Sequence, residues 1–435
     1  MRVAIVAVLF GSAGPACLRE TSHQCATADQ CGVSGTCEPD GHCSFADPVC
    51  ASGRRYGDGA GGQSGTCVGG VAVPDAGEDG ASDIDAGFLV DGGGTDATSG
   101  LIAHVPLADE MLGTVDLVIA LDATLDTSVL RYQGASQPWL TMITTEQGNN
   151  VALARLDTLA VSTGAFLDVT GGLPLIIVAR TIDVAGVIDA SASAAVDGPG
   201  AIVAGTSVGG DGASASNNDD GGGGGGGHGT AGGMGGAADL AMGGAVGAPG
   251  GDADLTTLTG AARGGRGAAT GCNRAAGGGG GGAIQLYASQ SLTVGGTIDV
   301  SGGGGRRNGA CAAGGGGGGA GGAIYLESTG SISILAAASL AANGGGGAAG
   351  GAFGAGSDGD DGAPGIMAAT GGGAVSGGGG AGGAGGALGT LPVAGGNGTL
   401  SGGGGGGAVG RIVLGAPAVT VNFGAAISPP AVRRN

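Results

Sequence analysis

Two stretches of the chain, Val184-Ala-Gly-Val-Ile-Asp-Ala-Ser191 and Val294-Gly-Gly-Thr-Ile-Asp-Val-Ser301, are nearly the same eight residues. In both, apolar side chains alternate with others on either side of a glycine, which is the two-residue period of short β-strands joined at a corner. A unit that returns at intervals, with no helical pattern between its copies, indicates stacked coils. The sequence therefore predicts an all-β chain.

The same alternation recurs along most of the chain, at 159–169, 175–188, 284–300, 324–340 and 412–427. One coil alone cannot bury its inward side chains, whereas stacked coils share one continuous narrow core. We expect a right-handed parallel β-helix, a solenoid, over residues 101–430. A β-sandwich is the alternative, although sandwiches do not usually show one unit copied at intervals.

Long glycine-rich insertions separate the copies, at about 197–282, 302–322 and 344–408, and glycine makes up 112 of the 435 residues. Two arrangements fit these tracts. They could be disordered loops that leave the corners of the solenoid, or they could pack as rods of polyglycine II helices, because no side chain intervenes. Ordering glycine costs conformational entropy, so rods would need many hydrogen bonds between segments.

Residues 1–17 have the pattern of an export signal peptide. Arg2 precedes an apolar stretch from Val3 to Phe10 that is too short to span a bilayer, and small residues then lead to Cys17. A small residue directly before a cysteine resembles a bacterial lipobox, although Gly14 stands where leucine is usual. We expect Cys17 to be lipidated and the protein to be exported and anchored in the outer membrane at the cell surface; a secreted protein is the alternative.

A cysteine-rich head follows at residues 18–70. It is so poor in apolar side chains that cross-links must supply its order. We expect three disulfides whose pairing stays open, because six cysteines allow 15 connectivities. A zinc site with His23 and His42 is the alternative. The six cysteines are Cys25, Cys31, Cys37, Cys43, Cys50 and Cys67.

Two further cysteines lie beyond an acidic, glycine-rich linker at 71–100. Cys272 is 12 residues before Ile284, and Cys311 is 13 residues before Ile324, so both occupy the same place in consecutive coils. Stacked strands lie about 4.8 Å apart, and a disulfide joins Cα atoms at about 4.4–6.8 Å. The spacing therefore predicts a Cys272–Cys311 disulfide.

The formal net charge is -20, with 35 acidic and 15 basic residues. This charge argues against nucleic acid and against anionic membranes as electrostatic partners. Membrane contact is then expected only through the N-terminal lipid, and extracellular glycans or other cell-surface proteins are the expected partners. No cofactor is expected; calcium is the one that the many carboxylates suggest.

Candidate catalytic motifs are few. Asp219-Asp220 and Gly227-His228-Gly229 are similar to motifs of polygalacturonase-like β-helix enzymes, but they lie in a low-complexity glycine run, and the Arg-x-Lys element of that class is impossible without lysine. The stretches 250–255 and 356–361 loosely echo a calcium-binding nonapeptide without keeping its pattern. We therefore expect no enzyme, with a polysaccharide hydrolase or lyase as the alternative.

Several parts together resemble glycine-rich surface lipoproteins of myxobacteria. These are the signal that ends in Cys17, the cysteine-rich head, the Asp/Gly/Ala linker, and Thr297-Ile-Asp-Val-Ser301 running into glycines. The glycine tracts are also similar to mycobacterial PE-PGRS repeats, whose N-terminal domain is missing here. The resemblance implies surface exposure and no defined activity. A structural or adhesive surface lipoprotein is thus expected, and a glycan- or ice-binding surface is a further alternative.

Overall fold

The computed structural model describes residues 25–31, 35–46, 52, 54–56, 68, 102–215, 219–251, 253–308, 311–351, 356–374 and 376–434. The chain divides into two compact units, Met1–Gly93 and Gly94–Asn435. Cys17, His23, Cys50, Cys67 and the linker 71–100 lie outside the described residues. Within the described ranges, no helix is long and apolar enough to cross a membrane.

The first unit contains a small antiparallel sheet of β1 (Thr36–Cys37), β2 (Cys43–Ala46) and β3 (Arg54–Tyr56), preceded by the 3-10 turn η1 (Ala28–Cys31). Two disulfides, Cys25–Cys37 and Cys31–Cys43, join Cα atoms 5.8 and 5.4 Å apart. They tie η1 and the residues before it to β1 and β2. The cross-links thus take the place of the apolar core that this segment lacks.

The second unit begins with the 3-10 turn η3 (Leu107–Asp109) and is otherwise built of strands and extended segments. Its strands are β4 (Asp116–Ile119), β5 (Ala123–Asp126), β6 (Arg131–Tyr132), β7 (Ala135–Ser136), β8 (Leu140–Thr144), β9 (Asn150–Arg155), β10 (Thr158–Val161), β11 (Phe166–Thr170), β12 (Leu175–Val184), β13 (Val187–Asp189), β14 (Ala283–Val294), β15 (Thr297–Asp299), β16 (Ala323–Ser328), β17 (Ser331–Ile334), β18 (Ser339–Ala341), β19 (Arg411–Gly415), β20 (Ala418–Val421), β21 (Ala426–Ser428) and β22 (Val432–Arg434).

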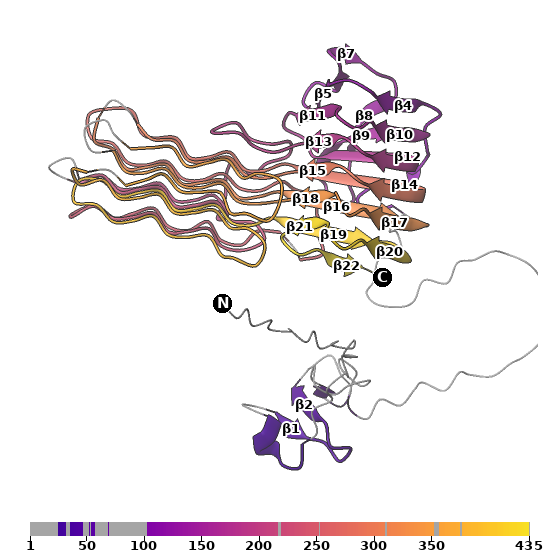
Figure 1. The fold of residues 1–435 in the computed structure, drawn as a ribbon, viewed down its shortest axis with the longest axis horizontal. Coiled ribbons are helices and arrows are strands. Elements are labelled where there is room, and N and C mark those ends of the chain that lie inside the picture. Colours follow the sequence, from indigo (N-terminus) through magenta and orange to yellow (C-terminus); the bar gives the residue numbers. More distant parts are fainter. Residues whose placement is uncertain are drawn as a thin grey trace, which may run out of the picture. The chain divides into compact units, whose positions relative to one another are not determined.

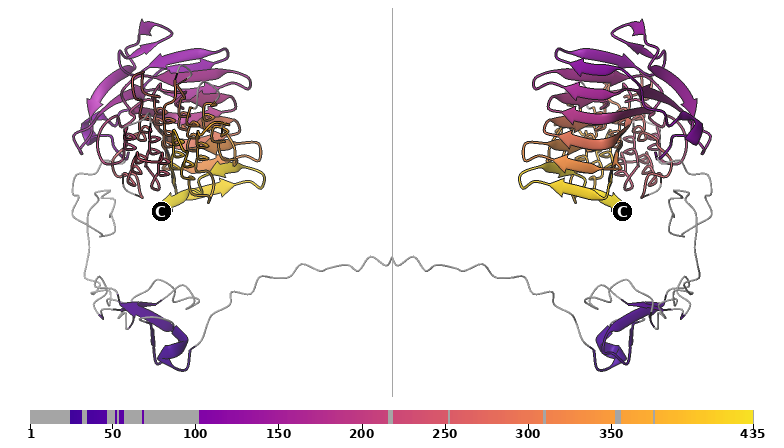
Figure 2. Two further views of the ribbon diagram at one scale, coloured as in Figure 1. Left: turned by 90° about the vertical axis from the view of Figure 1, so that its left-hand side faces the viewer. Right: turned by 90° about the vertical axis from the view of Figure 1, so that its right-hand side faces the viewer.

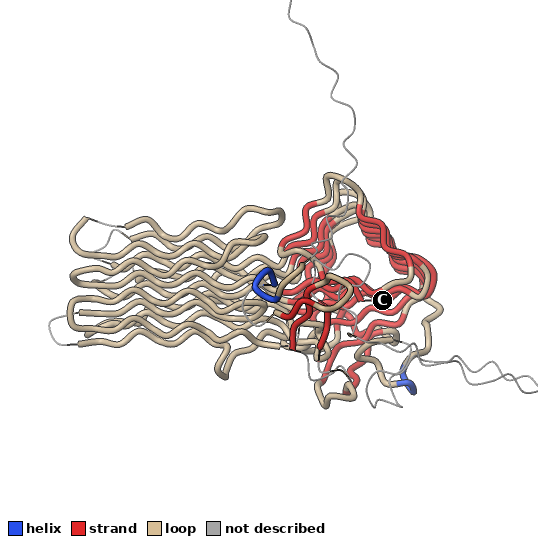
Figure 3. Tube along the Cα trace, turned by 90° about the horizontal axis from the view of Figure 1, so that it is seen from below, coloured by secondary structure: helices blue, strands red, loops and turns tan. Residues whose placement is uncertain are grey.

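Most of these strands pair in parallel with the strand that occupies the same place one repeat earlier. The two halves of β14 pair separately, the first with β16 and the second with β17, and β15 pairs with β18. The strands therefore form layers (Figure 2) that enclose a three-sided space when viewed from below (Figure 3). Identical positions of the repeat stack in rows, namely Ile284, Ile324 and Ile412; Leu292, Ile332 and Val419; and Ile298, Leu340 and Ile427.

The core fills this space with the inward side chains of each layer. Leu292, Ile298 and Ile332 are fully buried members of one continuous apolar cluster. A second cluster lies on the outer face of β12, β14 and β16, where Ile102 and Leu255 cover Tyr287 and Tyr325. The prediction of an all-β chain with disulfide-bonded cysteines near its N-terminus is confirmed.

Candidate functional site

The glycine-rich tracts are ordered segments that run out from the strands and return, side by side (Figure 1). We call the described residues of 190–282, 300–322 and 342–410 the glycine array. Its inner segments, 221–228, 314–322, 343–350 and 402–410, are buried at every residue. Of the two arrangements that the composition allowed, the structure has the packed one.

Backbone hydrogen bonds in the array repeat every third residue. Along segment 221–228, successive amides donate to three different neighbours and then return to the first. The donor–acceptor pairs are Gly222–Gly236, Gly223–Gly315, Gly224–Gly210, Gly225–Gly233, Gly226–Gly318 and Gly227–Ser207, at 2.8–2.9 Å. A period of three is the repeat of a polyproline II-type helix, here built from glycine.

Each inner segment is surrounded by other segments on all sides. Segment 221–228 exchanges backbone hydrogen bonds with six of them: 207–213, 232–236, 242–248, 261–268, 314–322 and 402–410. Six neighbours around one helix is hexagonal packing. Nearly every backbone polar group of the inner segments is thereby paired, which offsets the entropy lost on ordering glycine.

Hexagonal packing held by direct backbone hydrogen bonds leaves no room for a Cβ atom at the enclosed positions. A Cβ atom built on Gly223, Gly224 or Gly225 would collide with the carbonyl of a different neighbouring segment in each case. Outer segments have one open side, and there a side chain recurs every third residue, as in Ala381 and Ala384. The enclosed stretches 221–227, 314–319, 344–347 and 402–407 are accordingly glycine throughout, whereas outer segments such as 380–387 follow a Gly-Gly-x rhythm.

A disulfide closes the end of the array remote from the strands. Cys272 and Cys311 lie in the tips of two successive glycine tracts and are bonded, with Cα atoms 6.7 Å apart. Nearby, the carboxylate of Asp220 accepts hydrogen bonds from the amide and hydroxyl of Thr270, both at 3.0 Å. The pair is the one expected from the equivalent places of the two cysteines.

The structure separates the residues that resembled a polysaccharide-degrading site. Asp220 and His228 lie at opposite ends of one extended segment, about 25 Å apart at the rise of a polyproline II helix. His228 is fully buried, and burial, helped by the positive charge of Arg411, lowers its pKa to about 4. These residues cannot act as an acid–base pair on one bond, so the enzyme alternative loses its candidate residues.

Among the described residues, several candidate ligands for calcium or zinc are engaged with other groups of the protein. Asp358 pairs with Arg306 at 2.9 Å, and Asp360 accepts a hydrogen bond from Thr370. The only described group with metal-ligating spacing is that of Cys25, Cys31 and Cys37, whose sulfurs belong to the two head disulfides. Asp358, Asp360 and these three cysteines are therefore engaged with other protein groups, and Asp252 of the stretch 250–255 lies outside the described residues.

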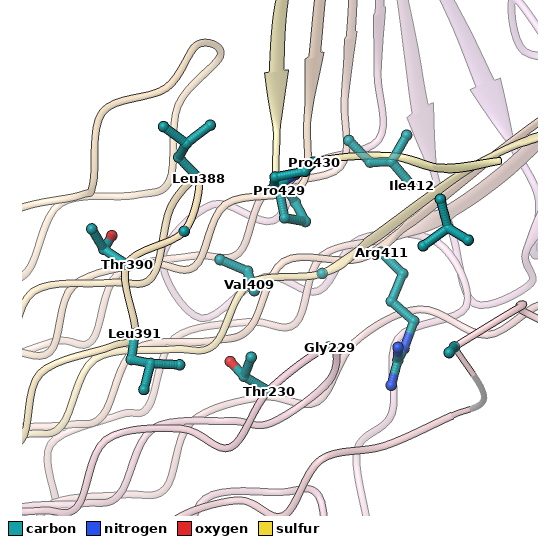
Figure 4. Close-up of a pocket in the computed structure, with 14 residues that line it drawn as sticks. Gly229, Thr230, Leu388, Thr390, Leu391, Val409, Arg411, Ile412, Pro429 and Pro430 are labelled. Atoms are coloured by element: carbon teal, nitrogen blue, oxygen red, sulfur yellow. The ribbon is translucent and has the colours of Figure 1, made fainter. Parts of the chain in front are cut away.

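A cavity of about 260 Å³ lies where the array meets β19 (Figure 4). The hydroxyls of Thr230 and Thr390 and the side chain of Arg411 line it together with apolar groups such as Leu391 and Val409. Arg411 donates to the carbonyls of Gly250 and Gly251 at 3.5 and 3.3 Å. The lining includes neither a carboxylate nor a histidine, so it lacks an acid–base pair.

A buried polar network ties the start of the second unit to the outer face of the strands. The amide of Gln285 donates to the carbonyl of Ala103 at 2.8 Å and to the carboxylate of Glu327 at 3.0 Å. His104 donates a ring N–H to the carbonyl of Leu255, and its Nδ1 lies 2.8 Å from Gln285 Oε1. Burial raises the pKa of Glu327 to about 7, against the weaker opposing effect of its N–H donors.

The titration of Glu327 gives a testable pH dependence. The folded chain binds this proton more tightly than the unfolded chain, so the stabilisation is complete below about pH 4.5 and is lost as pH rises through about 7. In Glu327→Gln the side-chain oxygen can still accept the same hydrogen bonds without titrating. We expect the unfolding free energy of wild type minus that of Glu327→Gln to fall by on the order of 1–3 kcal/mol between pH 5 and 7.

Urea unfolding at a series of pH values measures this difference. Glu146→Gln, which changes an exposed carboxyl, is the matched control and should follow the wild-type curve at every pH. Parallel curves for wild type and Glu327→Gln would show that the buried carboxyl does not titrate in this range.

Aspartates also stack where the chain leaves the strands for the array. Asp168, Asp189 and Asp299 stand in register on β11, β13 and β15. Burial raises the pKa of Asp299 to about 7, although the amide of Ser301 donates to its carboxylate at 3.0 Å. A hydrogen bond from a backbone amide to an aspartate two residues earlier stabilises a turn, here the turn through which the chain passes from β15 into the glycine array.

The chain matches no known protein family, no curated protein and no solved structure. Function must therefore be argued from this geometry alone. The glycine array is the most extensive feature that could serve it, and the described polar clusters are occupied in holding the fold together.

Proposed function

We propose that the chain is an exported cell-surface lipoprotein with a structural or adhesive role, in which a right-handed parallel β-helix carries the glycine array outward. Parallel rows of strands support the β-helix, and crossovers between parallel strands are right-handed in nearly all proteins. Extracellular glycans or other surface proteins would be its partners, and a lipid on Cys17 would hold it to the outer membrane.

The observation that carries this proposal is the backbone hydrogen bonding of the inner glycine segments. The only polar side chains in these described segments are those of His228 and Asn343, both buried, so the packing of the segments serves stiffness and shape. The disulfides add support, because such bonds persist in oxidising compartments outside the cytosol. A stiff projection with a cross-linked tip suits contact at a surface.

Surface display can be tested in cells that naturally produce the protein. An epitope inserted after Leu240, an exposed residue in a tip of the array, should be labelled by antibody on intact cells. Cys17→Ser should abolish incorporation of labelled palmitate and move the protein out of the membrane fraction. The proposal fails if the epitope is reached only after lysis, or if Cys17→Ser changes neither lipid labelling nor fractionation.

A further inference from the structure

The outer segments of the glycine array differ sharply in charge. We call 231–237, 242–248, 380–387 and 391–398 the uncharged face, and 207–213, 261–268, 300–307 and 357–362 the charged face. Segments of the uncharged face are mutual neighbours, since Gly235 donates to Gly244, Gly395 to Met234, and Gly396 to Ala381. In a chain of net charge -20, no Asp or Glu follows Asp361.

Three outward amides on the charged face donate to aspartates. Arg266 donates its backbone N–H to Asp211, Gly304 donates to Asp361, and Arg307 donates to Asp358, at 2.6–2.8 Å. Arginines in turn hold these carboxylates, as in the 3.0 Å pair of Arg274 with Asp211. Side chains thus close part of this edge, while the amides of Asp211, Asp358 and Asp361 donate no hydrogen bond among the described residues.

The uncharged face also has amides without a partner, and no charged side chain lies on its segments. Among the described residues, the amides of Met234, Ala381, Ala384 and Ala394 donate no hydrogen bond to the protein. Ala381 and Ala384 are three residues apart in one segment, whereas the amides of Ala237 and Ala387 donate to the side chains of Asn397 and Thr390. A row of free backbone donors is to this array what an unpaired edge strand is to a β-sheet, a template for another chain.

Apolar side chains are exposed along the uncharged face. Met234 is 57% exposed, Val393 53%, Leu391 68% and Met242 76%. Large exposed apolar patches mark interaction sites. The four segments carry no acidic group, and Asp239 in the turn between 231–237 and 242–248 is the nearest one in sequence. This makes the uncharged face the one on which two copies, otherwise self-repelling, can approach each other.

The array itself accepts neighbours of either direction. Segment 221–228 bonds in parallel with 314–322, through Gly223–Gly315 and Gly226–Gly318, and antiparallel with 207–213, through Gly224–Gly210 and Gly227–Ser207. A two-fold axis perpendicular to the segments makes those of the two copies antiparallel, and an axis along the segments makes them parallel; the array contains both arrangements. We propose that a second copy of this chain docks on the uncharged face, so that two glycine arrays join into one across a two-fold axis.

Sedimentation velocity of the full, oxidised chain tests this dimer. We expect wild type at twice the mass of one chain, and the double variant Met234→Glu/Val393→Glu at the mass of one chain, because carboxylates would then face one another across the axis. Arg266→Glu places a carboxylate at an exposed position of the charged face, on a segment that does not border the uncharged face, and should keep the doubled mass. Circular dichroism and thermal unfolding should show that all three remain folded.

Hydrogen exchange supplies a second readout. The amides of Ala381, Ala384 and Ala394 should exchange more slowly in wild type than in Met234→Glu/Val393→Glu, since docking pairs or covers them. Wild type at the mass of one chain up to its solubility limit would overturn the proposal, as would a doubled mass that survives in the double variant. Wild type that stays at the mass of one chain but cosediments with an insoluble polysaccharide through this face would assign the face to a glycan and also overturn the dimer.

Discussion

Replacing Gly318 with alanine should lower the free energy of unfolding by about 3 kcal/mol or more. Gly318 lies in an inner segment of the glycine array, and a Cβ there would collide with the backbone of Gly345 and Gly346. A flexible side chain could move aside, but backbone held by neighbours on every side cannot. The sign of the change in unfolding free energy is informative, because replacing glycine with alanine stabilises a protein by about 0.4–1 kcal/mol where the new side chain fits.

Urea unfolding of Gly318→Ala alongside Gly389→Ala measures this effect. Gly389 lies in a turn of the array where a Cβ would meet no heavy atom within 4 Å, so alanine there should be neutral or slightly stabilising. Equal effects at the two positions would mean that the inner segments have room for side chains, contrary to hexagonal packing.

The second large effect is expected in the core between the strands. Leu292 is fully buried and pairs in register with Ile182 on one side and Ile332 on the other. Leu292→Ala should cost about 2–5 kcal/mol, the lost burial plus the cavity left between stacked layers that cannot close independently.

Thr293→Ala is the control for this substitution, since Thr293 is the next residue of β14 and is only partly buried. It should change stability by about 0.5 kcal/mol or less. Similar losses for Leu292→Ala and Thr293→Ala would contradict the assignment of inward and outward sides, and with it the stacked core.

The strand body could be predicted because its signal is local and repeated. The two similar stretches pair with each other in the structure, Val184 with Val294 and Ile188 with Ile298, in the register that their alignment implies. Alternation with a period of two and a glycine at the corner specify both the strand and its inward side. Neighbouring copies then only have to stack.

Whether the glycine tracts are packed could not be decided from composition, since flexible and packed glycine share it. The distinguishing signal is the spacing of the residues other than glycine, as in the run at 379–387, where an alanine follows every second glycine. That rhythm marks a threefold helix with one open side, while uninterrupted glycine marks an enclosed one. The spacing of these alanines can be interpreted in this way only once the hexagonal packing of the segments is known.

The polar network on the outer face was beyond sequence reasoning for another reason. His104, Gln285 and Glu327 lie far apart in the chain and meet only because β14 pairs with β16 and the start of the unit folds over them. The motif at Asp219-Asp220 and His228 shows the opposite case, in which residues that suggested a catalytic site do not meet. Close in sequence, these residues are carried apart by an extended helix, whereas a compact loop would have brought them together.

The most direct test of the account is amide hydrogen exchange of the inner glycines, resolved by NMR with selective labelling of glycine. If the array is built as described, the amides of 222–227, 315–319 and 403–407 should be protected nearly as strongly as those of the core strand β14, and should exchange through global unfolding. Exchange of these glycines at the rate of an unstructured chain, while β14 stays protected, would contradict the packed glycine array.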